Sequence, residues 1–130
     1  MAAGSDPFDA TAVEAEVRTA FEAYERALIA NDVAAMDAAF WEDERVVRFG
    51  IAEIQHGFAE VAAWRASATP VPTNRRHERV VVTAFSADLA VVSLEFRNGD
   101  APSIGRQSQV WARLASGWSV VHAHVSMLLP

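Results

Sequence analysis

The chain lacks two side chains on which many enzymes depend, because its 130 residues include no cysteine and no lysine. Without cysteine there is no disulfide, no thiolate metal site and no thiol nucleophile. Without lysine there is no Schiff-base chemistry through an ε-amine. Any chemistry therefore falls to the eleven arginines, the four histidines, the carboxylates and a single tyrosine, Tyr24.

Long apolar runs are also missing, so no segment is long enough to span a bilayer. The first ten residues, MAAGSDPFDA, have neither a basic start nor an apolar stretch, so we expect no signal peptide. Together with the absence of cysteine, this favours a cytoplasmic location. The net charge of −6 argues against nucleic acid as the main partner, although one arginine can still draw a small anion into a pocket.

The chain does have enough apolar surface for a core, since 52% of its residues are hydrophobic. We predict a single domain over residues 1–130, with residues 1–9 as a flexible N-terminus. Helices are predicted over 10–30, 33–40 and 58–66, and strands over 46–50, 76–85, 89–97, 104–114 and 118–128, with a strand or turn over 51–57. This order indicates an α+β domain whose curved sheet wraps the first helix and leaves a cavity at its open end.

The last third of the chain, residues 103–127, alternates polar and apolar side chains over two long strands. A turn at Ser116-Gly117 would set Gln109 opposite His124. One face then carries Gln107, Gln109, Trp111, Arg113, Trp118, His122, His124 and Ser126, and the other is an apolar wall of Val110, Ala112, Leu114, Val121, Ala123, Val125 and Met127. Because the first face mixes rings with hydrogen-bonding groups, it is predicted to line a ligand pocket.

The element order and the ending GWSVVHAHVS resemble the NTF2-like (SnoaL-like, cystatin-like) superfamily over nearly the whole chain. The resemblance implies a cone of three N-terminal helices packed on a curved, mostly antiparallel sheet that encloses a cavity. Two segments, FEAYERALIANDVAAMDAAFWEDERVVRFG and IGRQSQVWARLASGWSVVHAHVS, are similar to the AtzH-like group, which includes an oxalurate-catabolism protein and a 1,3-dicarboxyurea decarboxylase. This similarity implies an active-site pair of Tyr24 and Arg48, and a homodimer formed through the outer, apolar sheet face.

Arg48 stands among apolar residues in VVRFG, and a buried guanidinium is costly unless it is paired. Two interpretations stay open. It either binds a ligand carboxylate in bidentate fashion, or it forms an internal ion pair with Glu53 or Glu95. Tyr24 lies on the apolar face of the first helix, where it is either a core residue or a proton donor at the cavity mouth.

His124 is a candidate third catalytic residue, because an imidazole can donate or shuttle a proton. Gln107, Gln109, Trp111 and Ser126 are candidate substrate-binding residues on the same face, able to read amide or carboxylate groups. No carboxylate cluster completes a metal site with the histidines, so we expect no metal. The basic run Arg75-Arg76-His77 with Arg79 is interpreted as solvated protection of a strand edge.

Three functions remain. The resemblance favours a cofactor-independent enzyme of ureido-acid nitrogen catabolism, which decarboxylates a small carboxylated urea or amide with Arg48 as the carboxylate anchor. Tyr24, with His124, would supply the proton. The alternative is a non-catalytic binding or scaffold subunit that partners an amidase. An isomerase or cyclase is ranked last, because it needs an acidic base in the pocket, for which Glu95 is the only candidate on a strand.

Overall fold

The computed structural model describes residues 8–129. Most of the predicted flexible N-terminus, residues 1–7, lies outside the described residues. Asp9 is the N-cap of the first helix and accepts a hydrogen bond from the backbone N–H of Ala12 at 3.1 Å. No helix within residues 8–129 combines the length and the hydrophobicity that crossing a bilayer requires.

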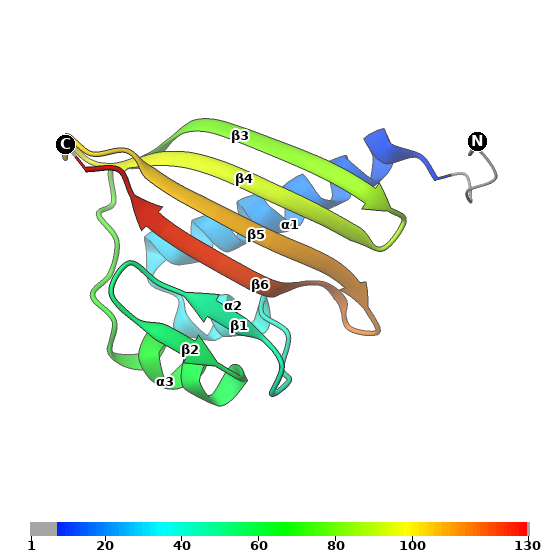
Figure 1. Ribbon diagram of the computed structural model, residues 1–130, viewed down its shortest axis with the longest axis horizontal. Helices are drawn as coiled ribbons and strands as arrows, with labels where there is room; N and C mark the ends of the chain where they lie inside the picture. Colours follow the sequence, from blue (N-terminus) through cyan, green and yellow to red (C-terminus); the bar gives the residue numbers. More distant parts are fainter. Residues whose placement is uncertain (1–7, 130) are drawn as a thin grey trace.

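Three helices and six strands follow in the predicted order (Figure 1). The helices are α1 (Ala10–Ala30), α2 (Val33–Ala38) and α3 (Phe58–Ser67). The strands are β1 (Val47–Phe49), β2 (Ile54–His56), β3 (Arg75–Ser86), β4 (Leu89–Asn98), β5 (Gly105–Leu114) and β6 (Gly117–Met127). The strand order across the sheet is β2-β1-β6-β5-β4-β3, and every pair is antiparallel except β1 with β6.

Helix α1 crosses one face of the long-stranded half of the sheet, while α2, α3 and the β1–β2 hairpin gather at one end (Figure 1). The helix carries a buried stripe at spacings of three and four, which includes Val13, Val17, Phe21 and Tyr24. These side chains pack against the inner face of the sheet, where Val92, Leu94, Phe96, Trp111 and Val120 are buried. The predicted α+β architecture, with a curved and mostly antiparallel sheet, is confirmed.

The β5–β6 hairpin differs from its predicted register at two points. Leu114 pairs with Gly117, so the turn residues are Ala115 and Ser116. Gly117 has a φ of 112°, a conformation that a residue with a Cβ rarely adopts. The second difference is a β-bulge, because Trp111 lies opposite Val120 whereas its neighbour Val110 lies opposite His122. Val121 is therefore an extra residue in β6.

One extra residue turns every later side chain of a strand to the other face of the sheet. The prediction of one polar and one apolar face is therefore wrong for the second half of β6. Gln107, Gln109 and Trp111 lie on the inner, helix-covered face, whereas His122, His124 and Ser126 lie on the outer face. The predicted apolar wall is divided in the same way, since Ala123 and Val125 face inward and Val110 and Ala112 face outward.

The outer face near β1 carries a cluster of rings instead of a uniform apolar wall. The ring of Phe49 lies 5.5 Å from that of His124, 5.8 Å from that of His122 and 6.2 Å from that of His56, centroid to centroid, each in an edge-on arrangement. These contacts join β2, β1 and β6 on the side away from α1.

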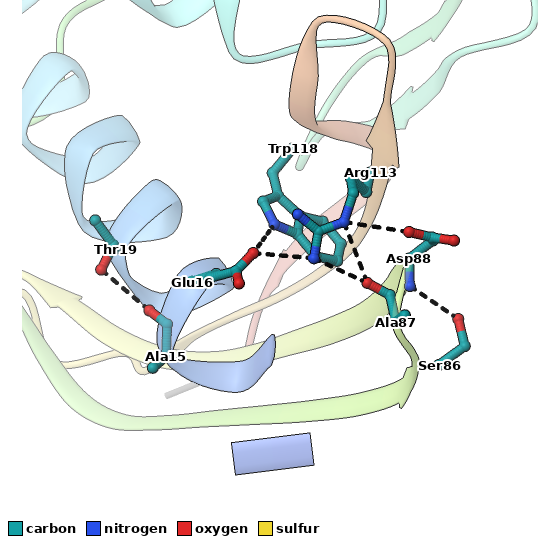
Figure 2. A network of polar contacts seen from close by, with 8 residues as sticks. All are labelled: Ala15, Glu16, Thr19, Ser86, Ala87, Asp88, Arg113 and Trp118. Atoms are coloured by element: carbon teal, nitrogen blue, oxygen red, sulfur yellow. Dashed lines mark hydrogen bonds and ion pairs between the residues drawn. The ribbon is translucent and has the colours of Figure 1, made fainter. Parts of the chain in front are cut away.

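A polar network joins the first half of α1 to the β3–β4 turn and to the ends of β5 and β6 next to their hairpin turn (Figure 2). Glu16 accepts a hydrogen bond from the indole Nε1 of Trp118 at 2.9 Å and pairs with Arg113 at 3.0 Å. The guanidinium of Arg113 stacks 4.7 Å from the Trp118 ring centre and donates to the Ala87 carbonyl and the Asp88 carboxylate in the β3–β4 turn. The hydrogen bond from Trp118 and the charge of Arg113 lower the pKa of Glu16 below its ordinary value.

This network predicts a pH-dependent contribution of Glu16 to stability. A carboxyl whose pKa is lower in the folded than in the unfolded protein stabilises the fold above its ordinary value of 4.5, and this contribution is lost as the pH falls toward the folded-state value. The free energy of unfolding of wild type should therefore exceed that of Glu16→Gln at pH 7, and the difference should shrink by pH 3. Urea titrations at both values measure it, with Glu22→Gln as the exposed control on the same helix. An unchanged difference at pH 3 would contradict the assignment.

Candidate functional site

A cavity of about 200 Å³ lies at the end of the domain where α2, α3 and the β1–β2 hairpin meet the inner face of the sheet. Its wall comes from all three helices, from the loop after α3 and from five strands. Polar wall residues are Tyr24, Asn31, Arg48, Glu53, Arg65, Thr69, Arg75, Asn98 and Gln107. This volume is smaller than that of a drug-sized ligand site, so the cavity suits a guest of only a few heavy atoms.

Three of the predicted site residues line this cavity: Tyr24, Arg48 and Gln107. Gln109 and Trp111 are on the same face of the sheet but lie in the core beneath, each 1% exposed. The indole Nε1 of Trp111 donates to the Gln109 side-chain oxygen at 2.9 Å, whereas the buried Nε2 of Gln109 has no hydrogen-bond partner within residues 8–129. They support the cavity and are not part of its wall.

The two remaining predicted residues, His124 and Ser126, lie on the opposite side of the sheet. The bulge at Val121 is the physical reason, because it reverses their facing. His124 is exposed and packs against Phe49, and the Ser126 hydroxyl accepts from Nε of Arg106 at 3.2 Å. The prediction that His124 donates a proton into the pocket is wrong, and so is the prediction that Ser126 binds the guest there.

Arg48 is held on the inner face of β1 by an internal ion pair. Its Nη1 donates to the Glu53 carboxylate and to the Gln55 side-chain oxygen, both at 2.9 Å. The guanidinium carbon lies 3.6 Å from the Trp64 ring centre, a close cation–π contact. Within residues 8–129, Nε and Nη2 of Arg48 donate no hydrogen bond, so two of its three nitrogens stay available to a guest.

The pairing with Glu53 is one of the two interpretations that the sequence left open. The other proposed partner, Glu95, lies on the outer face opposite Arg106. It can neither pair with Arg48 nor act as a base in the cavity. The strand residue named as the base of the isomerase alternative therefore lies outside the cavity.

The hydroxyl of Tyr24 is hydrogen-bonded to a second buried arginine, Arg65. Nη1 of Arg65 donates to the Tyr24 hydroxyl at 3.4 Å, and Nε of Arg65 donates to the Asp37 carboxylate at 2.8 Å. Nη2 of Arg65 is buried and has no hydrogen-bond partner within residues 8–129. Tyr24 is buried, as the core interpretation expects, and its hydroxyl accepts a hydrogen bond from a cation in the cavity wall.

Arg75 also lines the cavity but is fully engaged. Its Nε and Nη2 contact the two oxygens of Glu25 at 3.0 and 3.4 Å, and its other donors reach Asn98 and Gln107 at 3.4 and 3.5 Å. The arginine and glutamate side chains are only 3% and 4% exposed. The interpretation of Arg75 as a solvated edge residue is wrong. It links α1 to the end of the sheet.

Sequence reasoning missed Arg65 and misjudged Arg75. Arg65 follows Val61 by four residues in α3, and this spacing places it on the buried face of the helix. An arginine at a core position is the signal that identifies it. For Arg75 no comparable signal exists, because its partner Glu25 is fifty residues away in α1.

The cavity therefore presents two arginines with unused donors, Arg48 and Arg65, beside one phenol. Such a set has the chemistry to bind an oxygen anion and to hold a proton next to it. Within residues 8–129, no group of three or more histidines, aspartates and glutamates has an arrangement that suits a metal ion.

Comparison with known proteins assigns the family. The sequence profile of the AtzH-like family matches residues 6–130. The chain belongs to the AtzH-like family. This AtzH-like chain is 50% identical to a cystatin-like fold protein from Burkholderia xenovorans LB400, over 91% of this chain and 94% of that one, with a TM-score of 0.87. It is 41% identical to a DUF3225-family protein of unknown function from Pectobacterium atrosepticum SCRI1043, over 90% and 91%, with a TM-score of 0.86.

More distant structures share the fold of this AtzH-like chain. An NTF2-like protein of unknown function from Pseudomonas putida KT2440 is 23% identical over 89% of this chain and 87% of that one, with a TM-score of 0.73. This similarity shows that the AtzH-like chain shares the fold of that NTF2-like protein. No curated protein matches the sequence.

The buried pair of Arg75 and Glu25 predicts a large stability effect in this AtzH-like chain. Glu25→Gln keeps the shape of the side chain but leaves the guanidinium without its counter-charge, so the free energy of unfolding should fall by about 3 kcal/mol. Denaturant unfolding at pH 7 measures it, with Glu22→Gln as the exposed control. A loss below about 1 kcal/mol, the range of surface ion pairs, would contradict the proposed burial of the charge.

Proposed function

We propose that this protein is a cofactor-independent enzyme of ureido-acid nitrogen catabolism that decarboxylates a small N-carboxylated urea or amide. Arg48 holds the carboxylate of the substrate and Tyr24 donates the proton. The observation that carries the proposal is that these two residues line one small cavity while Arg48 keeps Nε and Nη2 free of hydrogen bonds within residues 8–129. The similarity to the group with the 1,3-dicarboxyurea decarboxylase points to the same chemistry.

The surroundings of Arg48 suit it to bind a carboxylate. Glu53 and Gln55 hold one corner of the guanidinium, and Trp64 supports its flat face. Because the group is already oriented, binding loses little side-chain entropy. The ion pair with Glu53 also stabilises the empty cavity, since an unpaired buried cation would cost several kcal/mol.

The reaction needs one bond to break and one proton to move. As the bond between the nitrogen and the carboxyl carbon breaks, carbon dioxide leaves and the electron pair stays on the nitrogen. The adjacent carbonyl delocalises this pair, and the hydroxyl of Tyr24 supplies the proton that makes a neutral amide. Solvent then returns a proton to the phenolate. The carbonyl group within the substrate thus accepts the negative charge, so no separate electron sink is needed.

The test is decarboxylation of 1,3-dicarboxyurea by the purified protein, followed as carbon dioxide release. Tyr24→Phe should lower kcat by about 100-fold, in the range for loss of a general acid. Arg48→Met should raise KM by about 10-fold or more, because it removes charged hydrogen bonds to the carboxylate.

His124→Ala is the matched control, since it alters a residue on the outer face and should keep the wild-type rate. Wild-type kinetics in both Tyr24→Phe and Arg48→Met would refute the assigned roles. Absence of turnover in wild type, with copurification of an amidase, would favour the scaffold alternative.

A further inference from the structure

Arg65 is a buried cation with an incomplete set of partners. Its side chain is 3% exposed, and it lies in the last turn of α3 on the wall of the cavity. Asp37 balances its charge through Nε, and the rings of Phe40 and Trp64 lie 4.7 and 5.8 Å from its guanidinium carbon. Nη2 donates to nothing within residues 8–129, although a buried donor without an acceptor destabilises the fold.

The bond between Arg65 and Tyr24 fixes the direction of the tyrosine proton. A guanidinium only donates hydrogen bonds, so the Tyr24 oxygen is the acceptor at 3.4 Å. The single O–H of the phenol is therefore left for another acceptor. Because Tyr24 is 5% exposed and lines the cavity, a guest in the cavity can be that acceptor.

The guanidinium groups of Arg48 and Arg65 both lie near the indole ring of Trp64. Their guanidinium carbons lie 3.6 and 5.8 Å from the centre of Trp64. Arg75 also lines the cavity, but its donors are bonded to Glu25, Asn98 and Gln107. It is therefore not available to bind a guest. Arg48 and Arg65 therefore both line the cavity, and both have nitrogens without a hydrogen-bond partner within residues 8–129, although Nη2 of Arg65 is itself buried. Arg65 also donates to the phenol.

We propose that Arg65 is a second substrate-binding residue, which also positions Tyr24, so that the cavity takes a small anion with two separate oxygen acceptors. A carboxylate binds Arg48, and a carbonyl or second carboxylate oxygen binds Nη2 of Arg65. Nη1 of Arg65 holds the phenol oxygen. This inference rests on the proposed function, and it adds a residue that neither the motifs nor the family similarity designated.

The assignment also accounts for the charge formed during proton transfer. When the Tyr24 proton moves to the substrate nitrogen, a phenolate oxygen remains where Nη1 of Arg65 already donates. The same guanidinium therefore stabilises the negative charge without rearrangement, as preorganised donors do. When solvent returns the proton, the hydrogen bond is restored to its starting state.

A double-mutant cycle tests the link between the two residues. In the wild-type background, Arg65→Met should lower kcat by about 100-fold, the usual loss when one preorganised donor is removed. In the Tyr24→Phe background the same substitution should change kcat far less, because there is no phenolate left to stabilise. Additive effects in the two backgrounds would show that Arg65 does not act through Tyr24.

Binding of malonate, measured by calorimetry, tests the second half without requiring turnover. Wild type should bind malonate, and Arg65→Met should weaken its Kd by about 10-fold or more through loss of a charged hydrogen bond. Arg106→Met is the matched control, because it makes the same substitution at an exposed arginine on the outer face of the sheet. Its Kd should stay close to wild type.

The outcomes separate the inference from the proposed function. If Arg65→Met equals wild type in kcat and in malonate binding while Tyr24→Phe and Arg48→Met are impaired, only the role of Arg65 fails. If Tyr24→Phe and Arg48→Met retain full activity, the proposed function fails. Circular dichroism and Tm verify folding, and Arg65→Lys, which keeps the charge, replaces Arg65→Met if the latter does not fold. The single nitrogen of lysine cannot take the positions that Nε, Nη1 and Nη2 of Arg65 occupy, so a wild-type Kd in Arg65→Lys would overturn the proposal.

Discussion

The need to neutralise guanidinium groups inside a small domain determines how the open end of the cone is built. Three arginines line one cavity, and each meets a carboxylate: Arg48 meets Glu53, Arg65 meets Asp37 and Arg75 meets Glu25. An unpaired charge at such depth would cost several kcal/mol, a large part of the stability of a domain. The carboxylates come from the β1–β2 turn, from α2 and from α1, so the pairs also connect the elements around the cavity.

The three pairs differ in what they leave unused. Arg75 is enclosed by polar partners on one side and by the Phe96 ring at 3.9 Å on another. Gly105 contributes to this packing, because a Cβ at that position would overlap the Phe96 ring. Arg48 is held through Nη1 alone, and Arg65 is held through Nε and Nη1. Arg75 thus stabilises the fold with all of its donors, whereas Arg48 and Arg65 line the cavity with some donors unpaired.

Much of the architecture could be predicted from the sequence because it depends on local patterns. The apolar stripe of α1 and the alternation in β3 to β6 are repeated many times, so a single exception does not obscure them. Facing within β6 could not be predicted, since it depends on one bulge that no residue type announces. Val121 is a good strand former and carries no signal of its extra status.

The site shows the same division between local and distant information. Tyr24 and Arg48 could be designated because both stand out from apolar surroundings in their own segments and because the resemblance to the AtzH-like group implies this pair. The partners of buried arginines could not be assigned, because Asp37 is 28 residues from Arg65 and Glu25 is 50 from Arg75. Only the folded chain brings these charges together.

The bulge in β6 has a consequence for how such sheets diversify. Loss or gain of one residue at this point exchanges an imidazole for an aliphatic group along the inner surface, while the hydrogen-bonded ladder on either side persists. Related chains with nearly identical sequences in this strand can therefore place different side chains in contact with a ligand. The number of residues between the β5–β6 turn and the end of β6 then determines which side chains face inward, as much as the identity of those residues does.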